Sequence, residues 1–313
     1  MIQYFKNIDN ETVEISKLEN DCWINLVPPF KEEEFLFLSD ELEIPIEFLR
    51  DSLDIDERPR YELQDLVKFI VIKTPTENNS FNDSDAYFIT IPICIILTHN
   101  EIITVNSFDN GAINKFLHSF QNRNAAKKNM MVLKIFEKVV QNFMEVLKEI
   151  NLRRNQYEQN LYESSKNEEL LNLMRIQKSL VYFITALRSN ELLMIKMVRT
   201  NFLSLNEEEK EFLEDLIVDT SQALEMANIY TNILSSTLDA FASIISNNQN
   251  QVLKRLTSVT IILQFPVLVA SIYGMNVSHI PYATSPYAFY IPIILSVAIS
   301  VIIGWYFTRK KLF

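Results

Sequence analysis

About half of the chain, in its middle, contains neither glycine nor proline. Residues 112–265, a stretch of 154, lack both and are rich in Leu, Glu, Lys, Asn and Met. Because glycine and proline are the residues that most often interrupt helices, this stretch predicts long α-helices. Polar windows at 158–168 and 204–209 are the expected turns. The helices are therefore predicted near 128–158, near 168–201 and from 207 onward.

The third helix is predicted to continue without a break to residue 273. Ser204, Asn206 and the acidic turn 207–209 are typical of a helix start, because negative charge suits the positive end of the helix dipole. A helix of 67 residues is about 100 Å long. Its apolar residues recur mostly at helical spacing and need partners, as in a bundle or coiled coil. They are Leu213, Ile217, Met226, Ile229, Ile233, Leu238, Phe241, Ile245 and Val252. Packing only on helices of the same chain is the alternative.

The first 125 residues have the pattern of a mixed α and β domain, with six of the ten prolines and short apolar runs. Strands are predicted at 22–27, 69–73, 87–97 and 102–105, and helices at 31–38, 46–52 and 112–120. The predicted fold class is thus an α+β domain, 1–125, followed by a stalk of long helices, 126–255, and a C-terminal part, 256–313.

Charge is distributed unevenly along the chain. Residues 1–250 contain 24 basic and 40 acidic side chains, whereas the last 63 residues contain five basic and no acidic ones. An acidic body repels phosphate backbones and attracts cations, which argues against a nucleic-acid partner. An enzyme is not expected either, because one glycine in residues 1–250 leaves no nucleotide-binding glycine loop. Two cysteines, Cys22 and Cys94, are too few for a disulfide framework.

Two uncharged runs near the C-terminus are long enough to cross a bilayer, 18 residues at 256–273 and 20 residues at 288–307. Basic residues lie just before the first run and just after the second, and the connection 277–287 has no Lys or Arg. The positive-inside rule then predicts a multi-pass protein of the plasma or inner membrane with both termini in the cytoplasm. Two buried core helices are the alternative.

The two runs differ in polarity. Thr257, Ser258, Thr260, Gln264 and Ser271 make the first run unusually polar. Polar side chains in hydrocarbon face water or another helix, so the first run is predicted to line a pore or an interface. The second run, in which Ser296, Ser300 and Gly304 are the only serine or glycine residues, is predicted to face lipid.

The sequence Tyr273-Gly274-Met275-Asn276 stands at the outer end of the first run. Together with two C-terminal spans and an acidic body, it resembles the signature of the CorA family of divalent-cation channels. Three upstream segments are similar to bacterial members as well: 54–62 (DIDERPRYE), 180–190 (LVYFITALRSN) and 223–248. The resemblance extends from about residue 20 to the end.

The resemblance implies a funnel-shaped homopentamer that takes up Mg2+, and also Co2+ and Ni2+, down the membrane potential. Its implied selectivity filter is Gly274, Met275 and Asn276. Mg2+ gives up its water reluctantly, so neutral acceptors are expected to hold the hydrated ion, and a ring of Asn276 side chains supplies them. The glycine would let the chain turn out of the helix, with Met275 packed beneath. A left-handed helix cap is the alternative role for Asn276.

The face of the helix that leads back from Asn276 matches the pore-lining positions of the family. It carries Asn250, Leu253, Leu256, Thr260, Gln264, Val267 and Ser271. Gln264 stands where Met is common and Val267 where Thr is common, which leaves the middle of the path open. Leu253 and Leu256 would form apolar rings suited to a dewetting gate, or else belong to an ordinary bundle core. Pro266 is expected to kink the helix.

Regulation by internal Mg2+ bound between protomers is also implied by the resemblance. Asp215 lies at the matching distance before the signature, and its partner on the α+β domain is predicted to be Asp109 or Asp85. A solvated acidic face is the alternative. Two other functions stay open: a zinc transporter of the ZntB branch, which the intact Met275 disfavours, and a membrane-tethered scaffold without transport. His279 in the outer connection is a weak candidate for Zn2+ or Ni2+. No organic cofactor is expected.

Overall fold

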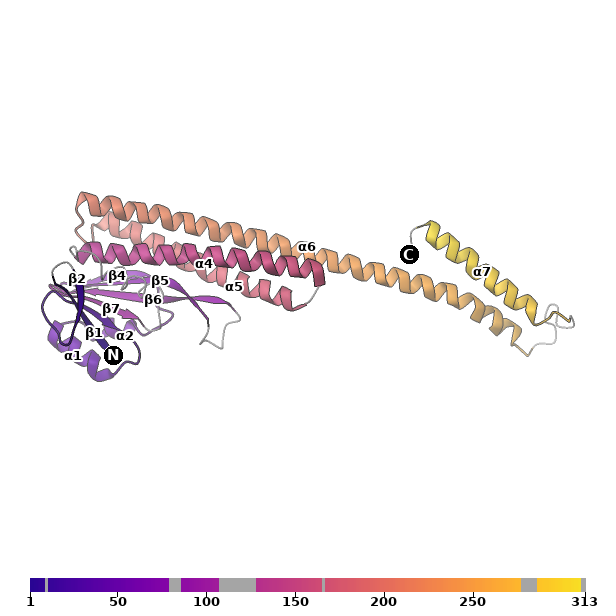
Figure 1. The fold of residues 1–313 in the computed structure, drawn as a ribbon, viewed down its shortest axis with the longest axis horizontal. Helices are drawn as coiled ribbons and strands as arrows, with labels where there is room; N and C mark the ends of the chain where they lie inside the picture. The colour runs from indigo at the N-terminus through magenta and orange to yellow at the C-terminus, as the bar shows by residue number, and fades with distance from the viewer. Residues whose placement is uncertain (9–10, 79–85, 107–127, 165–166, 277–285, 311–313) are drawn as a thin grey trace. The chain divides into compact units, whose positions relative to one another are not determined.

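The structure is a computed structural model that describes residues 1–8, 11–78, 86–106, 128–164, 167–276 and 286–310 (Figure 1). The chain divides into two compact units, Met1–Thr237 and Leu238–Phe313. The first unit holds an α+β domain and long helices, and the second holds the apolar C-terminal helices. Helix α6 (Glu207–Tyr273) begins in the first unit and ends in the second.

A seven-stranded sheet lies at the centre of the first unit, in the order β2-β1-β3-β7-β6-β5-β4. Neighbouring strands are antiparallel except β3 and β7, which are parallel. All ten residues of β6 are buried, as expected for a strand covered on both faces. The strands are β1 (Ile2–Ile8), β2 (Glu11–Ile15), β3 (Trp23–Leu26), β4 (Arg60–Gln64), β5 (Val67–Glu77), β6 (Phe88–Leu97) and β7 (Ile102–Asn106).

Helices cover both faces of this sheet (Figure 1). The short helices α1 (Glu32–Leu42) and α2 (Ile46–Asp51) pack on one face, where the Phe48 ring stacks on Phe69 at 4.6 Å between centroids. The long helices α4 (Lys128–Ser164) and α5 (Asn167–Thr200) pack on the other. There Phe183 of α5 contacts Phe88 of β6 and Phe143 of α4, at 6.2 and 5.4 Å between centroids.

Side-chain amides and a hydroxyl fasten the long helices to the sheet. The Asn190 amide of α5 accepts a hydrogen bond from the Lys73 N–H at 3.0 Å and donates to the Lys73 carbonyl at 2.8 Å. The last residue of β5 that pairs with β4 is Val71, so Asn190 takes the place of a strand neighbour beyond the end of β4. Asn142 of α4 and Ser179 of α5 bind other backbone groups of β5 and β6. The segment 180–190 therefore ends in a residue that completes the sheet.

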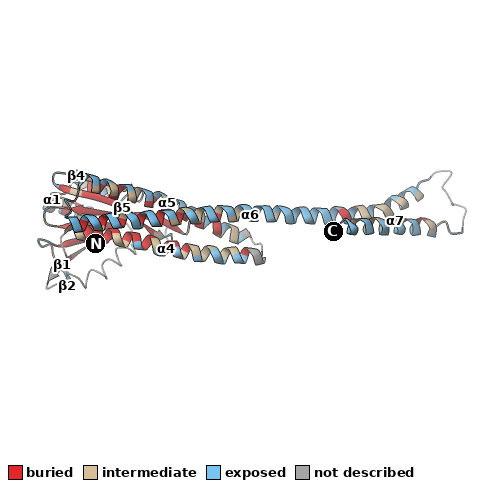
Figure 2. Ribbon diagram, turned by 90° about the horizontal axis from the view of Figure 1, so that it is seen from above, coloured by how far each residue is buried: buried red, intermediate tan, exposed pale blue. Residues whose placement is uncertain are grey.

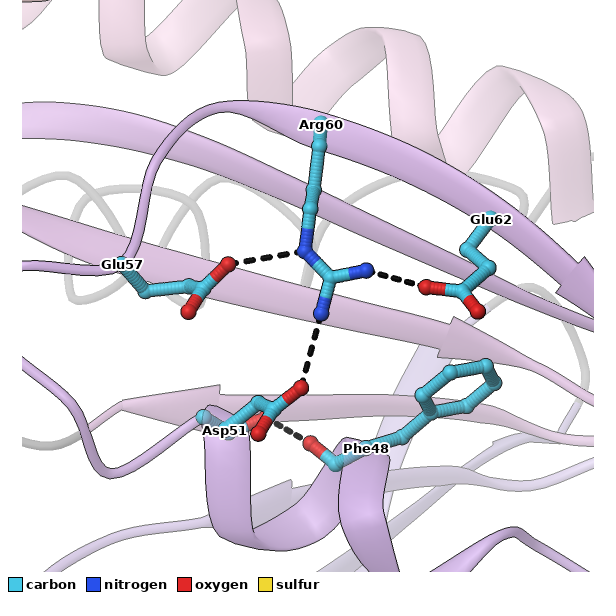
Figure 3. Close-up of polar contacts among 6 residues, drawn as sticks. Phe48, Asp51, Glu57, Arg60 and Glu62 are labelled. Carbon is cyan, nitrogen blue, oxygen red and sulfur yellow. Dashed lines mark hydrogen bonds and ion pairs between the residues drawn. The ribbon is translucent and has the colours of Figure 1, made fainter.

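The segment 54–62 is organised by one guanidinium group (Figure 3). Arg60 of β4 donates from Nε to Glu57 Oε1 at 2.8 Å and from Nη2 to Asp51 Oδ2 at 2.7 Å, and it also pairs with Glu62. Its Cζ lies 5.1 Å from the centre of the Phe69 ring. Three carboxylates from helix α2, the following loop and strand β4 thus share one cation, which ties these parts of the domain together.

Removing this cation should destabilise the first unit. Arg60→Gln leaves three neighbouring carboxylates without their shared cation. We expect the free energy of unfolding to fall by about 1–3 kcal/mol near neutral pH, seen as a lower melting temperature by circular dichroism. Burial raises the pKa of the Asp51 carboxyl, and Arg60 opposes that rise. Without Arg60 the pKa rises further, so the folded state binds the proton more tightly. The loss should therefore shrink as the pH is lowered from neutral and the carboxyl protonates.

Arg50→Gln is the matched control for this experiment. Arg50 pairs with Glu32 at 2.7 Å, but the two side chains are 58% and 59% exposed. An exposed pair of this kind contributes little to stability, so the control should melt within about 0.5 kcal/mol of the parent. Equal losses in the two variants, or a loss that does not change with pH, would contradict the role assigned to Arg60.

Helix α6 starts with a reciprocal cap. The Asn206 side chain accepts from the Glu209 N–H at 2.8 Å, and the Glu209 carboxylate accepts from the Asn206 N–H at 3.0 Å. Within the first unit, the buried stripe of α6 is made of smaller residues than the predicted stripe. It consists of Leu213, Leu216, Thr220, Ala223, Leu224, Ala227 and Leu234. Of the predicted stripe, Leu213 and Phe241 are buried, whereas Ile229, Ile233 and Val252 are exposed.

Most predicted elements are confirmed. The strand predictions correspond to β3, β5, β6 and β7, and the helix predictions to α1, α2, α4, α5 and α6, with α6 covering all 67 predicted residues. The first turn was placed too early, because α4 continues to Ser164. Strands β1, β2 and β4 were missed. The helix predicted at 112–120 lies outside the described residues.

Candidate functional site

The second unit is a hairpin of two packed helices. Helix α7 (Tyr290–Arg309) follows α6, and the Ser300 hydroxyl donates to the Ile262 carbonyl at 3.1 Å. A Cβ placed on Gly304 would lie 3.7 Å from Ile262 Cδ1, and Ser296 is 6% exposed. These three residues recur every fourth position and let the two backbones approach. These three residues face α6, so the lipid-facing surface predicted for the second run is the remaining surface of α7.

The remaining surface of these helices is exposed. Within the most apolar 18-residue window of each helix, only 6% and 11% of the residues are buried, which argues against two core helices (Figure 2). Both helices are long and apolar enough to cross a membrane. The α7 span begins two residues later than predicted and ends two residues later.

Helix α6 packs on α7 with one face only. Ser258 is 5% exposed, and the neighbours on its face, Ile261, Ile262, Phe265 and Val269, are half-buried. The seven predicted pore-lining residues are all exposed, including Leu256 and Val267 at 62% each. At 3.6 residues per turn, the set that leads from Asn250 to Ser271 lies about half a turn away from the α7-facing set.

The exposed surface of the first span is not uniform. Its uncharged polar side chains Thr260, Gln264 and Ser271 lie on the side away from α7, with Thr257 beside them. The Thr260 hydroxyl donates to the Leu256 carbonyl of its own helix at 2.8 Å, so its oxygen still offers acceptor capacity. The flanking exposed residues Val259, Leu263, Leu268 and Ile272 are apolar. The hairpin therefore has one polar face, and α7 does not cover it.

The last three residues of the signature, Gly274, Met275 and Asn276, follow directly after α6, which ends at Tyr273. Gly274 N–H donates to the Ala270 carbonyl at 2.9 Å, and Met275 N–H donates to the Ile272 carbonyl at 3.3 Å. No described glycine has a positive φ, and Asn276 is not among the described non-glycine residues that do. The glycine therefore does not make a left-handed turn here, and a Cβ at this position would make a tight contact of 3.2 Å with the Ala270 carbonyl oxygen. The left-handed cap considered for Asn276 is not observed.

The side chains of the signature are open in the single chain. Met275 is 55% exposed and Asn276 is exposed, so more than half of the Met275 surface is left open by the chain. Among the described residues the Asn276 amide has no recorded hydrogen-bond partner. Helix α6 continues through Pro266 without ending. At the other end of the predicted path, Leu253 and Leu256 present apolar surface, both more than half exposed.

The predicted regulatory site is only partly described. Asp215 of α6 is exposed, as are Glu214 and Asp219 beside it. Asp109, Asp85 and His279 lie outside the described residues, as does most of the connection 277–287. In the part of the chain that the structure describes, no group of three or more His, Cys, Asp or Glu side chains could hold a metal ion. The acids on α6 therefore do not make a metal site by themselves.

Comparison with known proteins agrees with this architecture, which is that of an integral membrane protein. Residues 20–310 match the family described as CorA-like Mg2+ transporter protein. The cobalt/magnesium transport protein CorA of Methanocaldococcus jannaschii is 27% identical over 293 residues, 92% of this chain and 90% of the relative. That of Thermotoga maritima is 22% identical, over 98% and 88%.

A solved structure shows the same fold over the whole length. The complete structure of the CorA magnesium transporter from Methanocaldococcus jannaschii superposes with a TM-score of 0.85 at 25% identity, covering 99% of this chain and 98% of that one. The chain belongs to the CorA-like family.

Proposed function

We propose that the chain forms a homopentameric channel through which hydrated Mg2+ enters the cytoplasm. The observation that carries this proposal is the polar face of α6, which α7 leaves uncovered and which ends at Asn276. In a bilayer, exposed polar groups such as Gln264 cost free energy unless they meet water or other helices. A closed ring of identical chains that turn this face inward satisfies them and creates a water-filled path.

The ion is selected at the outer mouth in this proposal. Mg2+ holds its water tightly, so a filter that removed the water would be slow. Neutral amide oxygens accept hydrogen bonds from the bound water and leave the ion hydrated. One Asn276 side chain cannot surround a hydrated ion, whereas symmetry-related copies can. No acidic residue follows the signature up to the C-terminus, so these amides and nearby carbonyls act without carboxylate help. Co2+ and Ni2+ are proposed to follow the same path.

The inner part of the path is proposed to close by dewetting. Rings of Leu253 and Leu256 would exclude water when the helices are close together. Mg2+ bound between protomers, at Asp215 of one chain and Asp109 or Asp85 of its neighbour, would keep the helices close together because it relieves repulsion among the acids. In the same proposal the α+β domain ends near residue 125, the stalk ends near residue 255, and both termini are in the cytoplasm. Lys254 and Arg255 before the first span, together with Arg309 and Lys310 after the second, support this orientation.

Ion flux into proteoliposomes tests the proposal. The purified chain is reconstituted, and uptake of Mg2+, Co2+, Ni2+ and Zn2+ is measured with an imposed voltage or with a proton gradient. A voltage of about 100 mV supplies roughly 4.6 kcal/mol for a divalent ion, so we expect Mg2+ uptake to follow the voltage and to need no proton gradient. Zn2+ uptake that requires protons would favour the ZntB-like alternative, and no uptake of any ion would favour a scaffold.

A further inference from the structure

Four basic residues lie at the same level near one end of the α6–α7 hairpin. The contact between Ser300 and Ile262 fixes the register of the two antiparallel helices. Lys254 and Arg255 lie eight and seven residues before Ile262, and Arg309 and Lys310 lie nine and ten residues after Ser300. Both pairs are therefore about 10–15 Å along the helices from the same contact, at the same level. These four residues are called the basic cluster below.

The α6 members of the cluster are on the side of the helix that faces α7. Lys254 precedes the buried Ser258 by four residues, and Arg255 precedes Ile262 by seven, both of which are helical repeats. Leu253 and Leu256 belong to the opposite face. The two α6 members of the basic cluster thus lie on the α7-facing side of α6, away from the proposed ion path.

Among the described residues, no acidic group is paired with the positive charges of the cluster. All four side chains are exposed, and none has a recorded ion pair among the described residues. The sequence contains no acidic residue after Asp239. The Arg309 guanidinium lies over the Trp305 ring, with Cζ 5.2 Å from its centre, which holds one of the charges next to an apolar surface. Like charges gathered in this way attract an anion.

Apolar surface adjoins the cluster and defines the kind of anion. On α7, Val301, Ile302 and Trp305 are 64%, 63% and 60% exposed, one to two turns before Arg309. A free phosphate ion has no apolar part that could contact that surface. A phospholipid, in contrast, can place its phosphate on the cations and its acyl chains along the helix. We propose that the basic cluster binds the headgroup phosphate of an anionic phospholipid, which bridges α6 and α7 at the cytoplasmic edge of the membrane.

Binding of phosphatidylglycerol to the detergent-solubilised full chain tests this proposal. Lipid is added to delipidated protein, and the melting temperature and bound lipid are measured against phosphatidylcholine and against inorganic phosphate. We expect phosphatidylglycerol to raise the melting temperature and the other two to have little effect. Each cation near an anionic lipid surface contributes about five-fold in affinity, so Lys254→Gln/Arg255→Gln should bind about twenty-five-fold more weakly.

Two further variants make the result specific. Lys196→Gln/Lys210→Gln removes the same charge from exposed positions of the first unit and should bind phosphatidylglycerol like the parent. Arg309→Gln/Lys310→Gln removes the other half of the cluster and should weaken binding as Lys254→Gln/Arg255→Gln does, which gives an independent answer if one pair folds poorly. Equal binding by cluster and control variants would overturn the proposal. Stabilisation by inorganic phosphate as large as that by phosphatidylglycerol would overturn it in favour of a free anion.

Discussion

Replacing Asn276 with Ala is expected to reduce Mg2+ uptake by about a hundred-fold or more. The substitution removes one neutral acceptor from each chain, hence five from the proposed ring. If each hydrogen bond to the water shell contributes only about 0.5 kcal/mol, the ring contributes about 2.5 kcal/mol, which is close to two orders of magnitude. The fold should not change, because Asn276 is exposed and has no recorded partner among the described residues.

The measurement is the rate of Mg2+ uptake under an imposed voltage, with protein density in the vesicles made equal. Asn20→Ala is the matched control, since Asn20 is an exposed turn residue of the first unit. It should transport like the parent. Gel filtration of the Asn276→Ala variant in detergent shows whether the assembly is retained. An assembled variant that transports at the parental rate would refute the amide ring and leave the scaffold or another filter as the explanation.

The long helices could be predicted from the sequence because a single physical property determines them. Residues 112–265 lack glycine and proline, and the cap at Asn206 and Glu209 is a local pattern that can be recognised without any partner. The missed strands differ in this respect. Strands β2 and β4 form the two edges of the sheet, and β1 lies next to β2. Partly solvated strands such as β4 (RYELQ) form without an apolar run. Whether such a segment becomes a strand depends on the strand with which it pairs, and the sequence does not reveal that strand.

The candidate site shows a similar division. Helical spacing predicts which residues share the face that leads to Asn276, and the structure places α7 on the opposite side. The packing of α7 on α6 was not predicted, although the four-residue spacing of Ser296, Ser300 and Gly304 is a signal for close helix packing. The structural use of Asn190 was not predicted, because its partner Lys73 is 117 residues away. In the proposal the partner of Asp215 is on a neighbouring chain, so no pattern within one chain could specify it.

Cysteine substitution should separate the two faces of the first span. We expect Thr260→Cys to be modified by a water-soluble cationic thiol reagent, with a loss of Mg2+ uptake of at least about ten-fold, because a ring of added positive charges repels a divalent ion in the path. Ser258→Cys is the matched control. Ser258 lies only two residues from Thr260, but it is packed against α7 and is 5% exposed. The reagent should therefore not reach a cysteine at position 258, and Mg2+ uptake should persist.

The parent chain is suitable for this experiment without further changes. Its two cysteines, Cys22 and Cys94, are both buried, and burial raises the pKa of the Cys94 thiol to about 12. Since the thiolate is the reactive form, neither should be modified at neutral pH, and reagent added to the parent should leave uptake unchanged. Inhibition at position 258 with protection at position 260 would mean that the α7-facing side lines the path, and the packing of the hairpin would then have to differ in the assembled channel.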